Sequence, residues 1–122
     1  MTKYTQKQIE DKIETLGEIQ EWNHDIELPY GIRTIGKEQA SHGKNLVKWG
    51  RIEQYLQVIN IQGKKILDVG CNEGFFSIQL NQLGAKNVVA LDISELRLEK
   101  AKFALDALNI SSVELKQLSI YD

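Results

Sequence analysis

The sequence predicts an α/β fold in which a helical N-terminal extension is followed by about three parallel strands. Short apolar runs around Ile66, Val88 and Val113 have the length and the branched residues of buried parallel strands. Glycine-marked turns and helical patterns separate these runs, as in successive βαβ units. A chain of 122 residues with a hydrophobic share of 42% can bury one core. We expect residues 1–62 to form the extension and residues 63–122 to form the sheet.

An amphipathic helix is expected close to the N-terminus. Thr5 and Gln8 have the spacing of a capping box, in which each side chain binds the other residue's backbone N–H. Apolar residues then recur at helical spacing, so they should form one stripe that faces the core or a partner. These residues are Ile9, Ile13, Leu16 and Ile19.

The rest of the extension should contain a loop or short hairpin over residues 22–36 and then a second helix. The loop region has glycine, proline and polar residues. Its Trp22 is expected to be a core anchor, and its His24 to be held by a backbone carbonyl, although a histidine there could also orient a substrate. The second helix is expected near Asn45 to Ile59, where apolar residues repeat at helical spacing: Ile52, Tyr55, Leu56 and Ile59.

The most informative feature is the strand at residues 66–69, which leads into a glycine turn and a helix. Asp68 lies at the carboxyl end of this strand, where open α/β sheets bind ligands. Gly70 and Gly74 mark places where the backbone turns tightly or is closely approached. The sequence therefore predicts a small-molecule site at this turn.

Two nucleotide-cofactor motifs compete for the turn, and the glycine spacing separates them. A dinucleotide fingerprint needs glycines at its first, third and sixth positions, but Asn72 and Phe75 stand at the third and sixth positions from Gly70. A nicotinamide-dependent dehydrogenase is therefore disfavoured. The order Asp68-x-Gly70-x-Asn72-x-Gly74 instead resembles motif I of class I S-adenosylmethionine-dependent methyltransferases. Asn replaces its middle glycine, and Asn tolerates left-handed backbone angles better than most residues.

The resemblance implies a partial Rossmann-like, doubly wound sheet with strand order 3-2-1 and the first strand at one edge. It also implies S-adenosyl-L-methionine as the cofactor, which carries a sulfonium but no phosphate, so an acidic residue beside the turn is favourable. A nucleophilic cysteine in the turn is less expected than a packing one. The residues implied in cofactor binding here are Asp68, Gly70, Cys71, Asn72, Gly74 and Phe75.

The ends of the next two strands supply the other implied cofactor residues. Asp92 follows the strand at residues 88–91 and should accept hydrogen bonds from a ribose diol, with Ile93 against the adenine. Asp92 can also be read as a neighbour of a helix start, with Ser94 as the cap and Asp92 left free. After the third strand, near Val113 to Leu118, the resemblance places Ser119 and Ile120 beside the adenine.

A narrower resemblance covers roughly residues 20 to 95. The patterns Trp22-x-His24-x-Ile26-x-Leu28, Gly31-Ile32-x-Thr34-x-Gly36 and Lys48-Trp49-x-Arg51 are similar to the segment before motif I in the methyltransferase-like family that includes tRNA wobble-uridine carboxymethyltransferases. In that family the segment packs over the cofactor pocket, which implies that Trp49 and Arg51 cover it.

Composition limits the substrate and the location. The net charge is −2 and the basic residues are scattered, so a small molecule or sugar is favoured over tRNA as the substrate. Cys71 is the sole cysteine, which excludes an internal disulfide and fits a reducing cytoplasm. No stretch has the length of a membrane span, and no metal-ligand cluster is recognised.

The expected function is therefore that of the cofactor-binding half of a methyltransferase, with an unidentified methyl acceptor and no recognisable catalytic residue. Because class I enzymes usually have seven strands, this part alone should be inactive. Its first strand would leave an apolar edge, which favours a homodimer. The alternative is a non-catalytic, methyltransferase-like interaction or assembly module, and cofactor affinity distinguishes the two.

Overall fold

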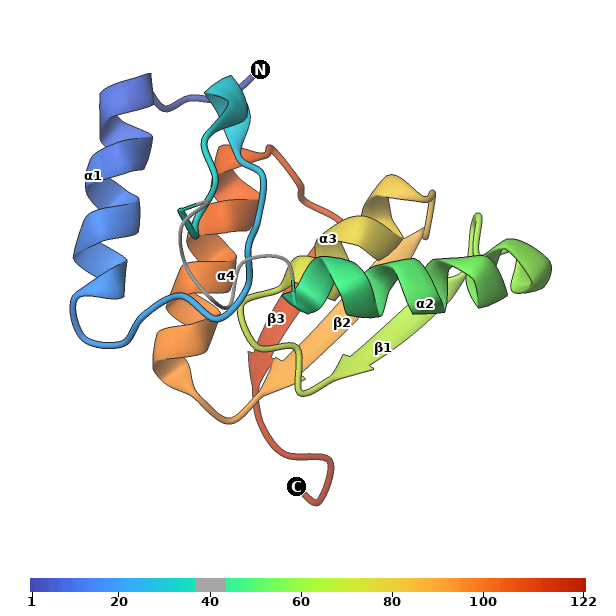
Figure 1. Ribbon diagram of the computed structural model, residues 1–122. Coiled ribbons are helices and arrows are strands. Elements are labelled where there is room, and N and C mark those ends of the chain that lie inside the picture. The colour runs from blue at the N-terminus through green and yellow to red at the C-terminus, as the bar shows by residue number, and fades with distance from the viewer. Residues whose placement is uncertain (37–43) are drawn as a thin grey trace.

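The computed structural model describes residues 1–36 and 44–122 and has the predicted α/β architecture (Figure 1). Its elements, in chain order, are α1 (Gln6–Gly17), the short 3-10 helix η1 (Pro29–Gly31), α2 (Lys44–Ile59), β1 (Lys65–Val69), α3 (Phe75–Gln82), β2 (Asn87–Asp92), α4 (Glu95–Ala107) and β3 (Val113–Gln117).

The strands of the described residues form a parallel sheet in the order β1-β2-β3. Leu67 of β1 lies beside Val89 of β2, which lies beside Glu114 of β3. The predicted order and the edge position of the first strand are confirmed. Since α3 and α4 each cross over to the next strand in the same direction, the right-handed crossover rule puts both helices on the same face.

The two faces of the sheet differ in how well they are covered. Residues that alternate along the strands, including Ile66, Val88 and Val113, pack in the core with residues of α3 and α4. The other face bears Leu67 and Val69, whose side chains are 59% and 52% exposed. Parallel sheets are normally buried on both faces, so this side of β1 is an unusually exposed apolar surface.

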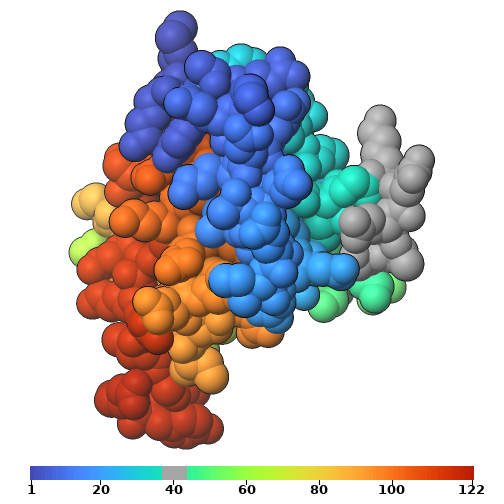
Figure 2. Space-filling model, turned by 90° about the vertical axis from the view of Figure 1, so that its left-hand side faces the viewer, coloured from blue at the N-terminus to red at the C-terminus, as the bar shows by residue number. Residues whose placement is uncertain are grey.

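Helix α1 begins as predicted and packs against α4. The Thr5 hydroxyl accepts a hydrogen bond from the Gln8 backbone N–H at 3.2 Å, and the Gln8 side chain accepts one from the Thr5 N–H at 2.8 Å. Ile9 is fully buried, but Ile19 is 82% exposed because the helix ends at Gly17, so the predicted stripe is wrong at that residue. Figure 2 shows α1 lying across the surface of α4.

Residues 22–36 form a loop with a small antiparallel bridge between Glu27 and Arg33, as predicted. Helix α2 is also confirmed, and it contacts the rest of the protein through a narrow stripe that includes Asn45, Trp49 and Leu56. Other apolar side chains of α2 are exposed, namely Leu46, Val47, Ile52, Tyr55, Val58 and Ile59. This leaves a second apolar surface beyond that of β1.

Residues from both predicted parts of the chain share a buried cluster. Ile9 and Trp22 of the extension belong to it together with Phe75, Val88 and Phe103. The division at residue 62 stays a prediction. In the described ranges, no helix is both long and apolar enough to span a bilayer.

Candidate functional site

The turn after β1 contains three left-handed residues in alternation. Gly70 has φ 71°, Asn72 has φ 54° and Gly74 has φ 91°. Glycine adopts these angles without a steric penalty, and Asn adopts them more often than most other residues, although with some strain. The expectation that Asn72 can replace a glycine in this turn is confirmed by its backbone angle.

The two glycines have different surroundings. A Cβ on Gly74 would lie 3.2 Å from the Cβ of Ala101, so this glycine allows close packing of the turn on α4. A Cβ on Gly70 would meet no atom of residues 1–36 or 44–122 within 4 Å. The backbone at Gly70 is therefore open to a ligand, whereas the backbone at Gly74 is closed by the protein.

Two carboxylates flank the turn. Asp68 accepts a hydrogen bond from the Ser77 hydroxyl at 2.6 Å, yet burial, together with the nearby charge of Asp92, raises the pKa of Asp68 above its usual value. The charge of Asp92 disfavours ionisation of Asp68, so a positively charged ligand between them would relieve the repulsion. The pair suits a cation and opposes a phosphate.

The side chain of Asp92 already accepts hydrogen bonds within the protein, so the expectation that it is left free is wrong. One of its oxygens accepts a hydrogen bond from the backbone N–H of Asn72 at 2.9 Å, and the other accepts one from Ser94 at 2.9 Å. The Ser94 hydroxyl caps α4 by accepting from Arg97 N–H, as expected. Because a carboxylate has about four lone-pair sites, Asp92 can still accept two more hydrogen bonds.

A cavity of about 240 Å³ opens beside this turn, at the carboxyl ends of the strands. It brings together five of the predicted cofactor residues, which come from the ends of all three strands. Arg97 also lines the cavity and was not among the predicted residues, although its place in the first turn of α4, shortly after Asp92, was a usable signal. The lining residues are Val69, Gly70, Leu91, Asp92, Ile93, Arg97, Leu118, Ser119 and Ile120.

The other predicted residues at the turn do not line this cavity, namely Asp68, Cys71, Asn72, Gly74 and Phe75. Cys71 is 1% exposed, and burial followed by the charges of Asp68 and Asp92 raises the pKa of its thiol to about 12, so a packing role fits. Phe75 is buried against neighbouring aromatic rings. The side-chain oxygen of Asn72 is buried and has no hydrogen-bond partner among the residues that the structure describes.

The predicted pocket cover lies to one side of the cavity. Trp49 is buried, with its ring centroid 6.4 Å from that of Phe75 and 6.3 Å from that of Phe76. Arg51 is exposed on α2. Neither lines the cavity, so a covering role for these two residues stays a prediction.

His24 has a role that the sequence did not reveal. Its Nδ1 accepts a hydrogen bond from the backbone N–H of Phe75 at 3.3 Å, so the ring caps the start of α3 instead of donating to a carbonyl. Burial, followed by the charges of Lys48 and Arg97, lowers its pKa to about 4. The ring is therefore neutral at physiological pH, as an acceptor at Nδ1 must be.

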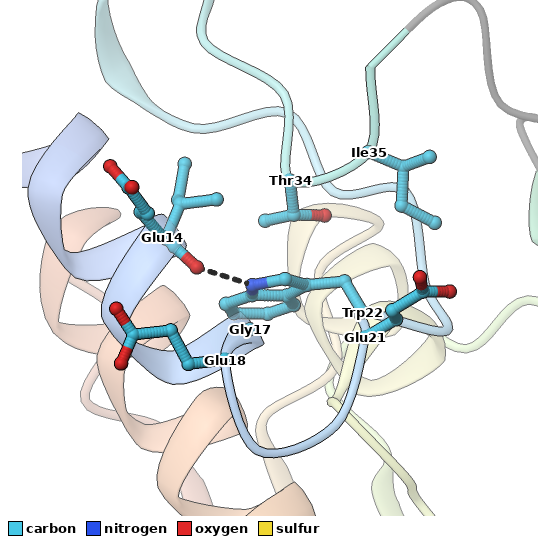
Figure 3. A pocket seen from close by; sticks show the side chains of 8 residues that line it. Glu14, Gly17, Glu18, Glu21, Trp22, Thr34 and Ile35 are labelled. Atoms are coloured by element: carbon cyan, nitrogen blue, oxygen red, sulfur yellow. Dashed lines mark hydrogen bonds between the residues drawn. The ribbon is translucent and has the colours of Figure 1, made fainter.

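Another hollow, of about 320 Å³, lies between α1 and residues 34–35, away from every predicted site residue (Figure 3). Trp22 forms part of its wall, and the indole Nε1 donates to the carbonyl of Ile13 at 3.0 Å. Its carboxylates come from Glu14, Glu18 and Glu21. This hollow is larger, but the strand ends and the glycine turn make the smaller cavity the candidate site.

Comparison with known proteins decides the family. The sequence profile described as "Methyltransferase domain" matches residues 61–122, which is half of the chain. The chain belongs to the methyltransferase domain family. The predicted family resemblance is thus confirmed, on the same residues that build the sheet and the cavity.

Two curated relatives are similar in sequence to part of this methyltransferase domain chain. Ribosomal protein L11 methyltransferase of Thermoanaerobacter pseudethanolicus is 36% identical over 62 residues, covering 51% of this chain and 20% of the relative. The tRNA U34 carboxymethyltransferase of Nautilia profundicola is 29% identical over 77 residues, covering 63% of this chain and 24% of the relative. The chain spans about a quarter or less of these relatives.

Solved structures share the fold. The N-terminal domain of EvdMO1, crystallised with SAH bound, has a TM-score of 0.73 at 19% identity, covering 94% of this chain and 46% of that one. Ribosomal protein L11 methylase from Lactobacillus delbrueckii subsp. bulgaricus has a TM-score of 0.51 at 26% identity, covering 56% and 35%. The likeness to the EvdMO1 domain extends over the helical extension as well as the sheet.

Proposed function

We propose that this chain is the cofactor-binding half of an S-adenosylmethionine-dependent methyltransferase. The observation that carries the proposal is the left-handed turn after β1, which is flanked by the carboxylates of Asp68 and Asp92 and opens into the cavity at the strand ends. A cationic cofactor without phosphates fits this arrangement, because the carboxylates attract a sulfonium or an ammonium and repel a pyrophosphate.

Each wall of the cavity suits one part of that cofactor. The free lone pairs of Asp92 can accept hydrogen bonds from the two ribose hydroxyls. Ile93 is 72% exposed and offers an apolar side chain to the adenine ring. Ser119 and Ile120, after β3, bound the same end of the cavity. The open backbone at Gly70 allows the amino acid end to approach closely.

When bound, the cofactor supplies an activated methyl group for in-line attack by an oxygen, nitrogen or carbon of the acceptor. The protein's contribution is to hold donor and acceptor in line, which can be worth about 7–11 kcal/mol of the barrier. Ligand pockets usually enclose about 300–1,000 Å³. The cavity of about 240 Å³ is smaller, so we infer that a further wall completes the pocket before turnover occurs.

For the acceptor, we propose a small molecule or a sugar. The net charge of −2 provides no electrostatic attraction for tRNA. A reducing cytoplasm is the compartment that fits a chain with one cysteine, which is buried and unpaired.

The second candidate function is a non-catalytic interaction or assembly module. The exposed Leu67 and Val69 of β1 and the exposed Tyr55 and Val58 of α2 favour it. In the sheet of the described residues, β1 is also an edge strand. An edge strand pairs readily with another strand, and a homodimer through β1 is the simplest arrangement. Cofactor binding and dimerisation are compatible, so affinity for the cofactor decides between the two functions.

The test is a calorimetric titration of the purified chain with S-adenosylmethionine and S-adenosylhomocysteine. Asp92→Ala should lower the affinity by at least about tenfold, because a hydrogen bond to a charged group is worth about 1.5–3 kcal/mol. Asp106→Ala, at the far end of α4, is the matched control and should bind as the wild type does.

Three results would contradict the proposal. Equal cofactor affinity in Asp92→Ala and the wild type would contradict the proposed contact between Asp92 and the ribose. Binding of a nicotinamide dinucleotide in place of both ligands would favour a dehydrogenase. A folded wild type that binds none of them, but sediments as a dimer, would favour the interaction module.

A further inference from the structure

A fully buried ion pair joins the glycine turn to α4. Glu73, inside the turn, and Lys100, on α4, are both 0% exposed, and the lysine Nζ lies 3.2 Å from the glutamate Oε2. Removing two charges from water costs several kcal/mol each, so such a pair persists only where further hydrogen bonds satisfy both groups.

In the described part of the chain, those further hydrogen bonds lead to residues 20–24 of the N-terminal extension. The other oxygen of Glu73 accepts from the backbone N–H groups of Asn23 at 2.7 Å and His24 at 2.6 Å. Lys100 donates to the carbonyls of Gln20 at 2.6 Å and Glu21 at 3.1 Å. We call residues 20–24 the clamp segment. The carboxylate binds its N–H groups and the ammonium binds its carbonyls.

The clamp segment in turn reaches the helix that follows the glycine turn. The lysine Nζ is 5.3 Å from the centroid of the Trp22 ring, so the aromatic face covers the charge. His24, whose backbone N–H is held by Glu73, accepts at its ring Nδ1 from Phe75. The clamp segment therefore binds both ends of the tripeptide at residues 73–75. Its backbone N–H groups bind Glu73, and the ring of His24 binds Phe75.

A turn with three left-handed residues needs such support. Backbone strain at non-glycine residues such as Asn72 persists only where the surroundings over-determine the conformation. On one side Asp92 binds the N–H of Asn72. On the other side the clamp segment binds the next residue, Glu73. The two contacts hold adjacent residues of the turn from different parts of the chain.

We propose that Glu73 and Lys100 are positioning residues that fix the glycine turn by fastening the clamp segment to it. The clamp segment lies outside residues 61–122, which match the methyltransferase family, so the extension is a structural part of the site. Only the effect on cofactor affinity rests on the proposed function. The mechanical link between the clamp segment and the turn stands independently of it.

The first test uses the unmodified chain without any ligand. In amide hydrogen exchange followed by NMR, the N–H groups of Asn23, His24 and Phe75 should open as one unit and show the same opening free energy. Opening of Asn23 and His24 that is more than about tenfold easier than opening of Phe75 would overturn the proposal.

The second test uses Lys100→Met, with Lys102→Met as the matched control, because Lys102 is exposed on the same helix. Lys100→Met should speed the exchange of Asn23 and His24 and lower S-adenosylhomocysteine affinity by about tenfold or more, since it leaves a buried carboxylate unpaired. The double variant Glu73→Gln with Lys100→Met removes both charges and keeps an amide oxygen for the two N–H groups. This double variant should recover part of the protection of the Asn23 and His24 N–H groups against exchange.

The outcomes distinguish the positioning role of Glu73 and Lys100 from the proposed cofactor-binding function. A folded Lys100→Met chain with wild-type exchange and wild-type affinity overturns the positioning role. If Lys100→Met does not fold, the exchange pattern of the wild type decides. A wild type that exchanges as one unit but binds no S-adenosylhomocysteine contradicts the proposed function and leaves the positioning role supported.

Discussion

Replacing Gly74 by alanine should be among the most damaging small substitutions in this protein. The residue has φ 91°, which an alanine adopts only with strain, and its new Cβ would lie 3.2 Å from the Cβ of Ala101. Both residues are buried, and Ala101 is 0% exposed on α4. The neighbour is a side chain with no rotamers, so it can move only with its helix.

The magnitude follows from two contributions. A left-handed backbone costs a non-glycine residue about 1–2 kcal/mol. Overpacking by one methyl group in a close-packed region costs about 1–3 kcal/mol. The free energy of unfolding of Gly74→Ala should therefore fall by about 2–5 kcal/mol. For a chain of this length, about 4 °C per kcal/mol gives a decrease in melting temperature of about 8–20 °C.

Gly70→Ala is the matched control, because Gly70 has φ 71° but a Cβ there meets no atom of the described residues within 4 Å. It should show the backbone contribution of about 1–2 kcal/mol alone. The assay is urea unfolding followed by circular dichroism, and Ala101→Gly in the Gly74→Ala background should recover part of the loss. Equal destabilisation by Gly74→Ala and Gly70→Ala, with no coupling to Ala101→Gly, would refute the packing argument.

Three further predictions concern titratable groups. Burial raises the pKa of Asp68, so the stability that this group contributes is complete below the ordinary carboxyl pKa and is lost as the pH rises. In urea unfolding, Asp68→Asn, which can still accept from Ser77, should gain stability relative to the wild type as the pH rises above the ordinary carboxyl pKa. The pKa of His24 is lowered to about 4, so its contribution to stability is complete above pH 6.5, and about 3 kcal/mol of stability is lost as the pH falls. His24→Gln should lack this loss, and NMR titration of the wild-type ring should show no protonation near pH 6.5. The thiol of Cys71, with a pKa of about 12, should react with Ellman's reagent only as fast as the protein unfolds, and rapid labelling of the native protein would contradict its burial.

Local patterns in the sequence were enough for the elements and the turn. The capping box of Thr5 and Gln8, the apolar strands and the alternating Gly70, Asn72 and Gly74 depend on interactions within a few residues. The order of the strands followed from the resemblance to doubly wound methyltransferase sheets. Asp92 and Ser119 could be expected at one site because parallel strands bring their carboxyl ends to the same edge, and the resemblance implied a role for Ser119 there.

Longer-range features required the tertiary structure. Glu73 and His24 are 49 residues apart, and Glu73 and Lys100 are 27 apart, so no local period relates them. The apolar residues of α2 have helical spacing whether their face is buried or exposed, and only the packing showed that Tyr55 and Ile59 face solvent. The sequence by itself determined the elements, the glycine turn and the acids at the strand ends, because these depend on backbone preferences and short spacings. The tertiary structure decided which charges are buried together and which apolar faces stay uncovered, because burial depends on what the rest of the chain places against each residue.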